Sequence, residues 1–533
     1  MTLDPAALQV LISRLGGVAD EMGAVLRRSA SSPNIKERAD CSAAVFDADG
    51  HLLAQAEHIP VHLGAMPASV SAAVAAYGDD LGPDDHVLVN DPFAGGTHLN
   101  DLTLVTPVFA GGQRIGWVAN RAHHADVGGA APGSMPADAT EIHQEGLRIP
   151  PTRWSPELRA LVLSASRTPD ERAGDLDAQV GANRVGAARL AELAHEPFDE
   201  VIAYGERRMR AALADLPDGT WRFEDVLDST GATSDQQRPA RVVVAVTVRG
   251  DEIAFDFTGT DPQARGNVNA VESVTTSAVA FALRSALDPT IPANGGALRP
   301  VRIVAPAGTL VAARPPAAVG AGNVEVSQRI ADVCLGALAQ VLPDRVGAAG
   351  QGTMNNLLVG GDGWVYYETV GGGEGGHPHR PGMSGVHTAM TNTDQVDLRL
   401  GEPHHGQSGI QTGLTNTRNT PAEALERAYP MRVLRYRIRD GSGGVGWARG
   451  GDGVERDLLM LEDVTVSLIT ERRVSQPWGV FGGEAGATGE NWLLPGGDNA
   501  RAERLPDKCI LRVKAGDVVR MLTPGGGGWG RAR

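Results

Sequence analysis

Two stretches decide how the first quarter of the chain folds, Asn90-Asp-Pro-Phe-Ala-Gly-Gly-Thr-His-Leu-Asn-Asp101 and Trp117-Val-Ala-Asn-Arg-Ala-His-His-Ala-Asp126. The run 102–109 has strand composition, 111–112 is a Gly-Gly turn signal, and 114–120 predicts the returning strand. The start of the first strand in such a hairpin faces the end of the second. We therefore expect Asp101 to lie near His123 or His124.

This hairpin would gather side chains that can bind a metal. His98 and Asp101 are three residues apart beside the glycine-rich turn at 95–96, and the second strand would add the imidazole of His123 or His124. Two imidazoles and carboxylates make a mixed nitrogen and oxygen site for a divalent metal. The ordinary alternative is a hydrogen-bonded surface pair, because His-x-x-Asp spacing is common. Polar clusters on glycine-rich loops nevertheless mark binding more often than packing, so both interpretations stay open here.

Length and composition predict several domains. The chain has 533 residues, which is too long for one core, and its 42% hydrophobic content is ordinary for a soluble globular protein. The 68 glycines favour many turns and short strands. We expect a mixed α/β fold of the α+β kind, with hairpin-rich sheets and packed helices. The expected domains are a metal-binding domain (1–220), a hairpin and helix domain (221–345) and a glycine-rich, mostly β domain (346–533).

The charge and the cysteines exclude several classes of protein. The net charge is −16, and no basic run is long enough to follow a phosphate backbone, so we expect no nucleic acid partner. Cys41, Cys334 and Cys509 have no CxxC spacing, which indicates a reducing, cytoplasmic location and excludes a cysteine-rich zinc site. We also expect no signal peptide, because the N-terminus lacks a charged start followed by an apolar run. We expect no membrane span, because no stretch of 18 or more residues is apolar.

Periodicity predicts the main helices and hairpins. The expected helices are one beginning at Asp4-Pro5 with a soft spot at Gly16-Gly17, one running from about 167 towards 195, and those at 198–214, at 263–285 and from 323 onward. The expected hairpins are 42–55 and 241–259. The terminal Thr523-Pro-Gly-Gly-Gly-Gly-Trp-Gly530 suits a close approach of backbones.

Several other polar groups have two interpretations. His58 and His62 are four apart, but Pro60 argues against a helix between them, so a structural role is favoured. Glu145 and Asp126 are also interpreted as structural. Two similar pieces, 384–393 and 408–417, are accompanied by histidines that suggest a second metal site or, preferably, a solvated polar loop: His377, His379, His387, His404 and His405. The glycine-rich run 371–376 is not a Walker loop, because no Lys-Ser/Thr follows it.

The chain resembles the hydantoinase B/oxoprolinase family. That family includes the B subunits of N-methylhydantoinases and related lactamases, the C-terminal half of 5-oxoprolinase and the large subunit of acetone carboxylase. The matching motifs cover nearly the whole chain in the expected order: 32–42 (SPNIKERADCS), 58–64 (HIPVHLG), 90–101, 120–126, 145–151 (EGLRIPP), 174–179 (GDLDAQ), 415–421 (TNTRNTP) and the terminal glycine run. The doubled segment 376–407 departs from the family pattern, which leaves substrate preference and loop position open.

The resemblance implies a metal held by Asp40, His98, Asp101 and one histidine of the pair 123–124, of which we select His123. Zn, Mn and Fe(II) suit these ligands similarly. The resemblance also implies a hetero-oligomer with a hydantoinase A-type subunit, which carries ATP and Mg and phosphorylates the substrate oxygen. The absence of a phosphate loop here fits that division.

The implied function is the metal-dependent B subunit of an ATP-dependent cyclic amide hydrolase acting on a hydantoin, lactam or 5-oxoproline. Such an amide is resonance-stabilised and resists water. Phosphorylation of its oxygen gives a good leaving group, and a metal lowers the pKa of the attacking water. The alternative is the large subunit of an acetone or acetophenone carboxylase, although the chain length favours the hydrolase. A non-catalytic scaffold is a third possibility, which the retained ligand-type residues argue against.

Overall fold

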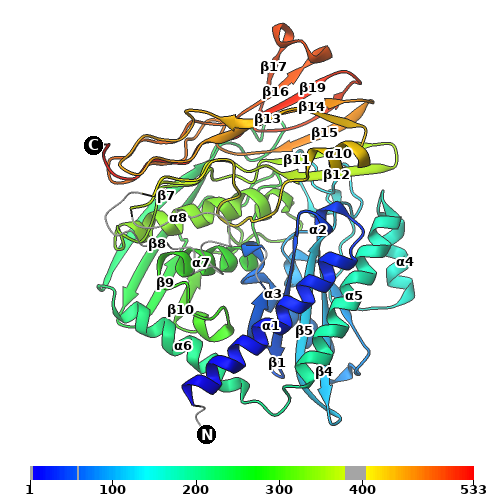
Figure 1. The fold of residues 1–533 in the computed structure, drawn as a ribbon, viewed down its shortest axis with the longest axis vertical. Helices are drawn as coiled ribbons and strands as arrows, with labels where there is room; N and C mark the ends of the chain where they lie inside the picture. Colours follow the sequence, from blue (N-terminus) through cyan, green and yellow to red (C-terminus); the bar gives the residue numbers. More distant parts are fainter. Residues whose placement is uncertain (1–3, 57–58, 379–403, 533) are drawn as a thin grey trace.

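The computed structural model describes residues 4–56, 59–378 and 404–532. Helices pack against four sheets, of which the first two lie side by side and the two formed by the last third of the chain lie at the end opposite the N-terminus (Figure 1). Adjacent strands are antiparallel except for one pair. The predicted mixed α/β class with hairpin-rich sheets and packed helices is confirmed. Within the described ranges, no helix is long and apolar enough to cross a membrane.

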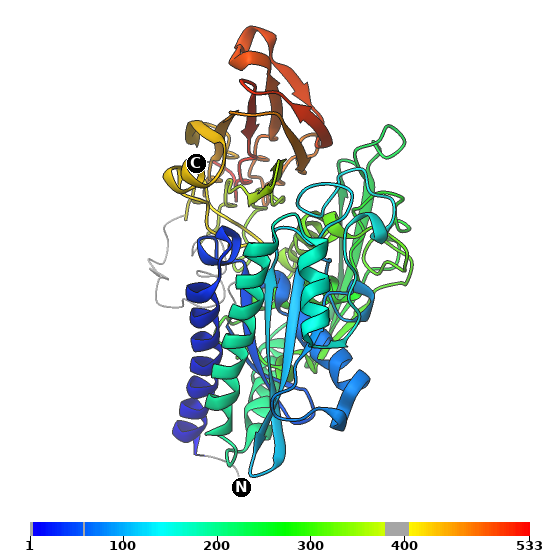
Figure 2. The same ribbon diagram turned by 90° about the vertical axis from the view of Figure 1, so that its right-hand side faces the viewer.

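The first sheet is built around the predicted β4–β5 hairpin. Its strand order is β2-β1-β5-β4-β3-β6. The strands are β1 (Cys41–Asp47), β2 (Leu52–Ala56), β3 (Val87–Val89), β4 (Asp101–Ala110), β5 (Gln113–His123) and β6 (Thr152–Arg153). Helices α1 (Pro5–Ser29) and α5 (Pro169–Ala191) cover one face (Figure 2), and α3 (Ala65–Tyr77) covers the other. Because both faces are covered, β1 and most of β4 and β5 are buried.

Three further helices complete this part: α2 (Pro33–Lys36), α4 (Pro156–Ala165) and α6 (Phe198–Ala214). The last has the predicted limits. Helix α1 runs without interruption through the expected soft spot, and a Cβ added at Gly16 or Gly17 would meet nothing within 4 Å.

The second sheet has the order β10-β9-β8-β7. Its strands are β7 (Gly219–Leu227), β8 (Ala240–Arg249), β9 (Glu252–Asp256) and β10 (Val301–Val304). Helix α8 (Ser327–Ala339) packs on β7 and β8, with α7 (Glu272–Ala286) beside it. The predicted helix 263–285 is wrong in its first part. Asn269 donates from its amide to the carbonyls of Ala264, Gly266 and Ala318, and this holds the preceding residues as a loop.

The last third of the described chain forms two packed sheets, β12-β11-β15-β18 and β13-β14-β19-β16-β17. A short helix, α10 (Ala422–Ala428), precedes β13. The strands are β11 (Asn356–Gly361), β12 (Trp364–Thr369), β13 (Met431–Arg439), β14 (Gly453–Met460), β15 (Val464–Ile469), β16 (Glu490–Leu494), β17 (Glu503–Leu505), β18 (Lys508–Val513) and β19 (Val518–Leu522). Alternate strand residues from both sheets fill the core between them.

The largest hydrophobic core contains residues from all three predicted domains, so the limits 1–220, 221–345 and 346–533 stay a prediction. Buried ion pairs also join the second and third segments. Arg472 binds Asp225 on β7 and Asp332 on α8, each at 2.7 Å. Removing one partner of such a group would leave a buried charge uncompensated, which is strongly destabilising.

The terminal glycine run passes between backbones, as its composition predicts. The amide of Gly526 donates to the carbonyl of Gly451, and that of Gly527 donates to the carbonyl of Ala349. A Cβ at Gly526 would lie 1.9 Å from the carbonyl oxygen of Glu374. No side chain therefore fits at this position without moving the backbone.

We predict opposite effects of the same substitution at two glycines. Gly526→Ala should lower the free energy of unfolding by about 2 kcal/mol or more, because the added methyl group overlaps backbone atoms. Gly17→Ala should raise it by about 0.5–1 kcal/mol, because alanine is the better helix former and the site is open. Urea unfolding followed by circular dichroism measures both. Equal effects of the two substitutions would contradict this account of the glycine run.

Candidate metal centre

The β4–β5 register places Asp101 directly opposite His123. A short turn, Pro92–Ala94, precedes β4, and Asp91 caps it by accepting the amide of Phe93. Gly95 follows in the left-handed region with φ 93°, and a Cβ there would lie 2.5 Å from the carbonyl oxygen of Ala68. Gly95 therefore lets the loop approach α3 closely, and this places His98 at the end of the hairpin.

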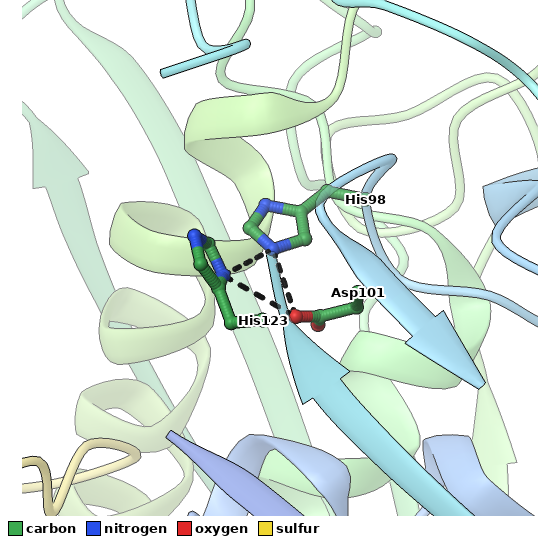
Figure 3. A group of neighbouring side chains, drawn as sticks. All are labelled: His98, Asp101 and His123. Atoms are coloured by element: carbon green, nitrogen blue, oxygen red, sulfur yellow. Dashed lines mark hydrogen bonds and ion pairs between the residues drawn. The ribbon is translucent and has the colours of Figure 1, made fainter. Parts of the chain in front are cut away.

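The side chains of His98, Asp101 and His123 point toward one another (Figure 3). His98 Nε2 lies 3.2 Å from His123 Nδ1 and 3.2 Å from Asp101 Oδ1, and His123 Nδ1 lies 3.3 Å from the same oxygen. Ligand atoms about 2.1 Å from one cation are about 3.0–3.4 Å apart in octahedral or tetrahedral geometry. The three donor atoms therefore have the spacing and chemistry of one face of a metal site. All three residues are buried, with exposed fractions of 0%, 1% and 3%.

Neighbouring residues of a strand point to opposite faces, and this separates the two histidines. His123 lies on the α3 side with Asp101, whereas His124 Nε2 lies 2.9 Å from Gln179 Oε1 on α5. The sequence alone did not show which of the two histidines pairs with Asp101 in the hairpin. The observed register supports the selection of His123.

Asp40 lies next to this group but outside it. It precedes β1, and its carbonyl accepts the amide of His123 at 3.1 Å. Burial raises the pKa of its carboxyl to about 7, although the Arg38 charge opposes this shift. The ligand atoms that lie within 4.8 Å of one another come from His98, Asp101 and His123. The structure thus gathers three of the four proposed ligands, and the fourth stays a prediction.

The second oxygen of Asp101 is held by neighbouring donors. Thr97 Oγ1 donates to Oδ2 at 2.5 Å, and His62 Nε2 and Asn323 Nδ2 each lie 3.5 Å from it. His62 Nδ1 in turn lies 2.9 Å from Ser42 Oγ. Burial raises the pKa of Asp101, but the charge of His98 and the hydrogen bonds from the histidines outweigh burial, so the pKa falls well below its usual value. Oδ1 faces the nitrogen atoms of His98 and His123, with which it would share a bound cation.

The last third of the chain supplies one wall of the centre. The ring of Tyr367 on β12 stacks on His123, with centroids 4.7 Å apart and planes 17° apart. The guanidinium of Arg38 lies 5.0 Å from the ring centroid of Tyr367 and donates to the carbonyl of the same residue. The Tyr367 hydroxyl donates to Asn356 Oδ1. Nothing in the sequence around 367 marked this contact, because it joins strands far apart in the chain.

Other candidates from the sequence have ordinary partners. Of the two histidines given a structural role, His58 lies outside the described residues, and His62 supports Asp101 as described above. Glu145 accepts the backbone amides of Val319 and Gly320, and Asp126 accepts those of Gly128 and Gly133. Burial raises the pKa of Glu145 to about 7 against these two hydrogen bonds.

The second histidine cluster is only partly described. His377 and His404 form a backbone bridge, and His405 Nδ1 accepts the amide of Arg449. His379 and His387, with the first of the two similar pieces (384–393), lie outside the described residues. In the described part of the chain, the other metal-type group is Asp47, Asp49 and His51 in the β1–β2 turn. There Asp47 accepts the backbone amides of Asp49 and His51, which is an ordinary turn.

Comparisons with known proteins identify the family of this chain. The sequence profile described as hydantoinase B/oxoprolinase matches residues 4–402 and 400–532. An uncharacterized protein of Methanocaldococcus jannaschii is 39% identical over 99% of this chain and 91% of its own length. 5-oxoprolinase 1 of Arabidopsis thaliana is 37% identical, and a putative D-/L-hydantoinase B subunit of Pseudomonas sp. is 31% identical, each over 99% of this chain. The chain therefore belongs to the hydantoinase B/oxoprolinase family.

The matches differ in how much of the relative they cover. The chain spans 90% of the Pseudomonas hydantoinase protein but only 42% of the plant oxoprolinase. Among solved structures, the ATP-dependent caprolactamase of Pseudomonas jessenii has a TM-score of 0.85 and 27% identity, over 100% of this chain and 92% of that chain. Acetone carboxylase has a TM-score of 0.83 at 20% identity, over 99% and 76%, which shows a shared fold.

We predict that two histidine substitutions remove the metal and a third does not. Purified wild-type protein should contain about one transition metal per chain. His98→Ala and His123→Ala should lose it, whereas His124→Ala should keep it, because His124 points to α5. Elemental analysis by mass spectrometry measures the content. If His123→Ala kept the metal and His124→Ala lost it, His124 would be the ligand in place of His123. A wild-type protein that is fully active without metal would contradict the metal centre itself.

We also predict that His62→Ala weakens metal binding about 10- to 100-fold, since groups that orient a ligand typically matter by this factor. His51→Ala is the matched control, because this half-exposed histidine belongs to the β1–β2 turn. Competition with a metal-binding dye gives both dissociation constants. Unchanged affinity in His62→Ala would show that Thr97 and Asn323 orient Asp101 without it.

Proposed function

We propose that this chain is the metal-dependent B subunit of an ATP-dependent cyclic amide hydrolase. Its substrate is a hydantoin, a lactam or 5-oxoproline, activated by a partner subunit of the hydantoinase A type. The observation that carries the proposal is the buried triangle of His98, Asp101 and His123. Relatives named as a putative hydantoinase B subunit and as 5-oxoprolinase support the substrate class, as does the caprolactamase fold.

The residues of the centre fit a divalent transition metal such as Zn, Mn or Fe. His98 and His123 offer nitrogen atoms and Asp101 offers Oδ1, with Asp40 as the proposed fourth ligand. A divalent metal held by these residues would lower the pKa of a water nucleophile and would polarise an oxygen of the substrate. Thr97 and His62 fix the orientation of Asp101, and the side chains of His98, Asp101 and His123 are buried from bulk solvent.

The partner is proposed on the same grounds. An unactivated cyclic amide is a poor electrophile, and phosphorylation of its oxygen requires an ATP site. The described residues contain no Walker-type loop, and the run 371–376 packs against the terminal glycines. We therefore place ATP and Mg on the A-type subunit and infer a hetero-oligomer. Three unpaired cysteines support a cytoplasmic location.

We predict activity only in the complete system. The chain, the A-type subunit, ATP and a panel of hydantoins, lactams and 5-oxoproline should yield ring-opened product and ADP. Product should not form from this chain alone, because nothing then activates the amide oxygen. Chromatography of products and a coupled ADP assay measure both. Turnover without ATP would contradict the proposed partner.

The carboxylase alternative is an outcome of the same experiment. The acetone carboxylase structure shares the fold, so the fold cannot separate the two functions. Acetone and acetophenone are therefore added to the panel with and without bicarbonate. Bicarbonate-dependent consumption of a ketone, without opening of any ring, would replace the hydrolase proposal by the carboxylase.

A further inference from the structure

Asn323 presents a buried and unused hydrogen-bond acceptor beside the metal centre. It belongs to a π-helical turn, Gly322–Val326, which directly precedes α8. Its Nδ2 lies 3.5 Å from Asp101 Oδ2, and its exposed fraction is 3%. Its Oδ1 has no hydrogen-bond partner among the described residues. Buried amide oxygens are rarely left without a partner, so this one calls for an explanation.

The orientation of the amide follows from its neighbour. Reversing it would turn Oδ1 towards the Asp101 carboxylate, and two acceptors would then face each other without a proton between them. Nδ2 therefore faces Asp101, and Oδ1 points away from the carboxylate. Ser327 Oγ donates to the backbone carbonyl of Asn323 at 2.6 Å, which fixes the main chain from which this amide projects.

The same π-helical turn contacts the centre by a second route. Glu325 Oε1 accepts Asn356 Nδ2 at 2.8 Å, and Asn356 Oδ1 accepts the hydroxyl of Tyr367, whose ring stacks on His123. The turn thus contacts Asp101 through Asn323 and His123 through Glu325, Asn356 and Tyr367. π-helical turns often occur at functional sites, because the extra residue redirects side chains.

We propose that Asn323 Oδ1 accepts the ring N–H of the substrate and so selects secondary cyclic amides. This inference rests on the proposed function. In a cyclic amide the N–H is bonded directly to the carbon that must be attacked. A hydrogen bond from that N–H to Asn323 would orient the carbon towards the proposed metal ligands beside Asn323. The bond also favours the protonated nitrogen after the oxygen is activated, which makes the adjacent carbon more electrophilic.

The proposal makes Asn323 a specificity determinant. An N-methylated lactam has no N–H to donate, and a ketone has no nitrogen at all. Each would leave Oδ1 buried without a partner, which sites built for hydrogen bonding disfavour strongly. A residue that is merely structural would affect all substrates alike.

The test compares two lactams, each with its own N-methyl derivative, in the complete complex with ATP. The probes are ε-caprolactam and 5-oxoproline, each with its N-methyl counterpart. Asn323→Leu, which keeps the approximate side-chain shape, and Asn323→Ala should lower kcat/KM for the N–H compound about 10- to 100-fold. Loss of the Asn323 contact to Asp101 should affect both compounds alike, so the readout is the ratio of kcat/KM for the N–H compound to kcat/KM for the N-methyl compound, which should fall about 10- to 100-fold. Competition binding of the same pairs to the complex without ATP gives a second ratio, independent of turnover.

A matched control is Asn267→Ala. Asn267 is also buried with an unpartnered Oδ1, but its amide donates to the Pro136 carbonyl and not to Asp101. This variant should change both members of each pair by the same factor. Metal content and thermal unfolding of all variants show whether the centre is intact.

The outcomes separate this inference from the proposed function. A fall in the ratio of kcat/KM for the N–H compound to that for the N-methyl compound supports it. Equal loss on both compounds, or no loss on either, overturns it while the wild-type activity still supports the hydrolase. Failure of the wild-type complex to open any cyclic amide overturns the proposed function and this inference with it.

Discussion

The pairing of Asp101 with His123 across the β4–β5 hairpin is the constraint on which the centre depends. Side chains alternate along a strand, so a shift of one residue would bring His124 to the site and turn His123 to α5. The fold fixes the register from both faces. Trp117 and Val105 pack against α3, while Val118 and Val108 pack against α1 and α5. A metal that needs three ligands within a few tenths of an ångström thus depends on hydrophobic packing farther along the same strands.

Electrostatic balance at the centre follows from burial. Three acidic or basic ligands would be costly in a dry interior if they were isolated. Asp101 is stabilised as a carboxylate by the histidines and Thr97, whereas burial lowers the pKa of His123 to about 3 and so keeps its imidazole neutral. A neutral imidazole and an ionised carboxylate are the forms that bind a cation. Asp101 and His123 are therefore in the binding-competent state at neutral pH, whereas burial at His98 is outweighed by the neighbouring carboxylates, which raise the pKa of His98, so a cation would compete with a proton for that imidazole.

The sequence predicted this part of the molecule well because the information is local. Strand composition, a Gly-Gly turn and a His-x-x-Asp spacing were enough to place Asp101 beside the pair 123–124. The choice within that pair required the register, and the role of His62 required three-dimensional contacts. Tyr367 and Asn323 gave no local signal, because each reaches the centre from another sheet or helix. The helix predicted at 263–285 began too early, because hydrophobic periodicity carries no information about the side-chain hydrogen bonds by which Asn269 holds the preceding residues in a loop.

Stacking of Tyr367 on His123 has a consequence for biosynthesis. The ligands come from the first quarter of the polypeptide, yet one wall of their pocket is translated some 240 residues later. Domains of nascent chains generally fold from the N-terminus onward, so the ligand triangle is expected to form while its wall is still missing. During that interval the imidazole of His123 is open to water and to any cation in the cell. The ion that the proposed centre encloses would then depend on what is abundant near the ribosome as well as on the donor atoms themselves.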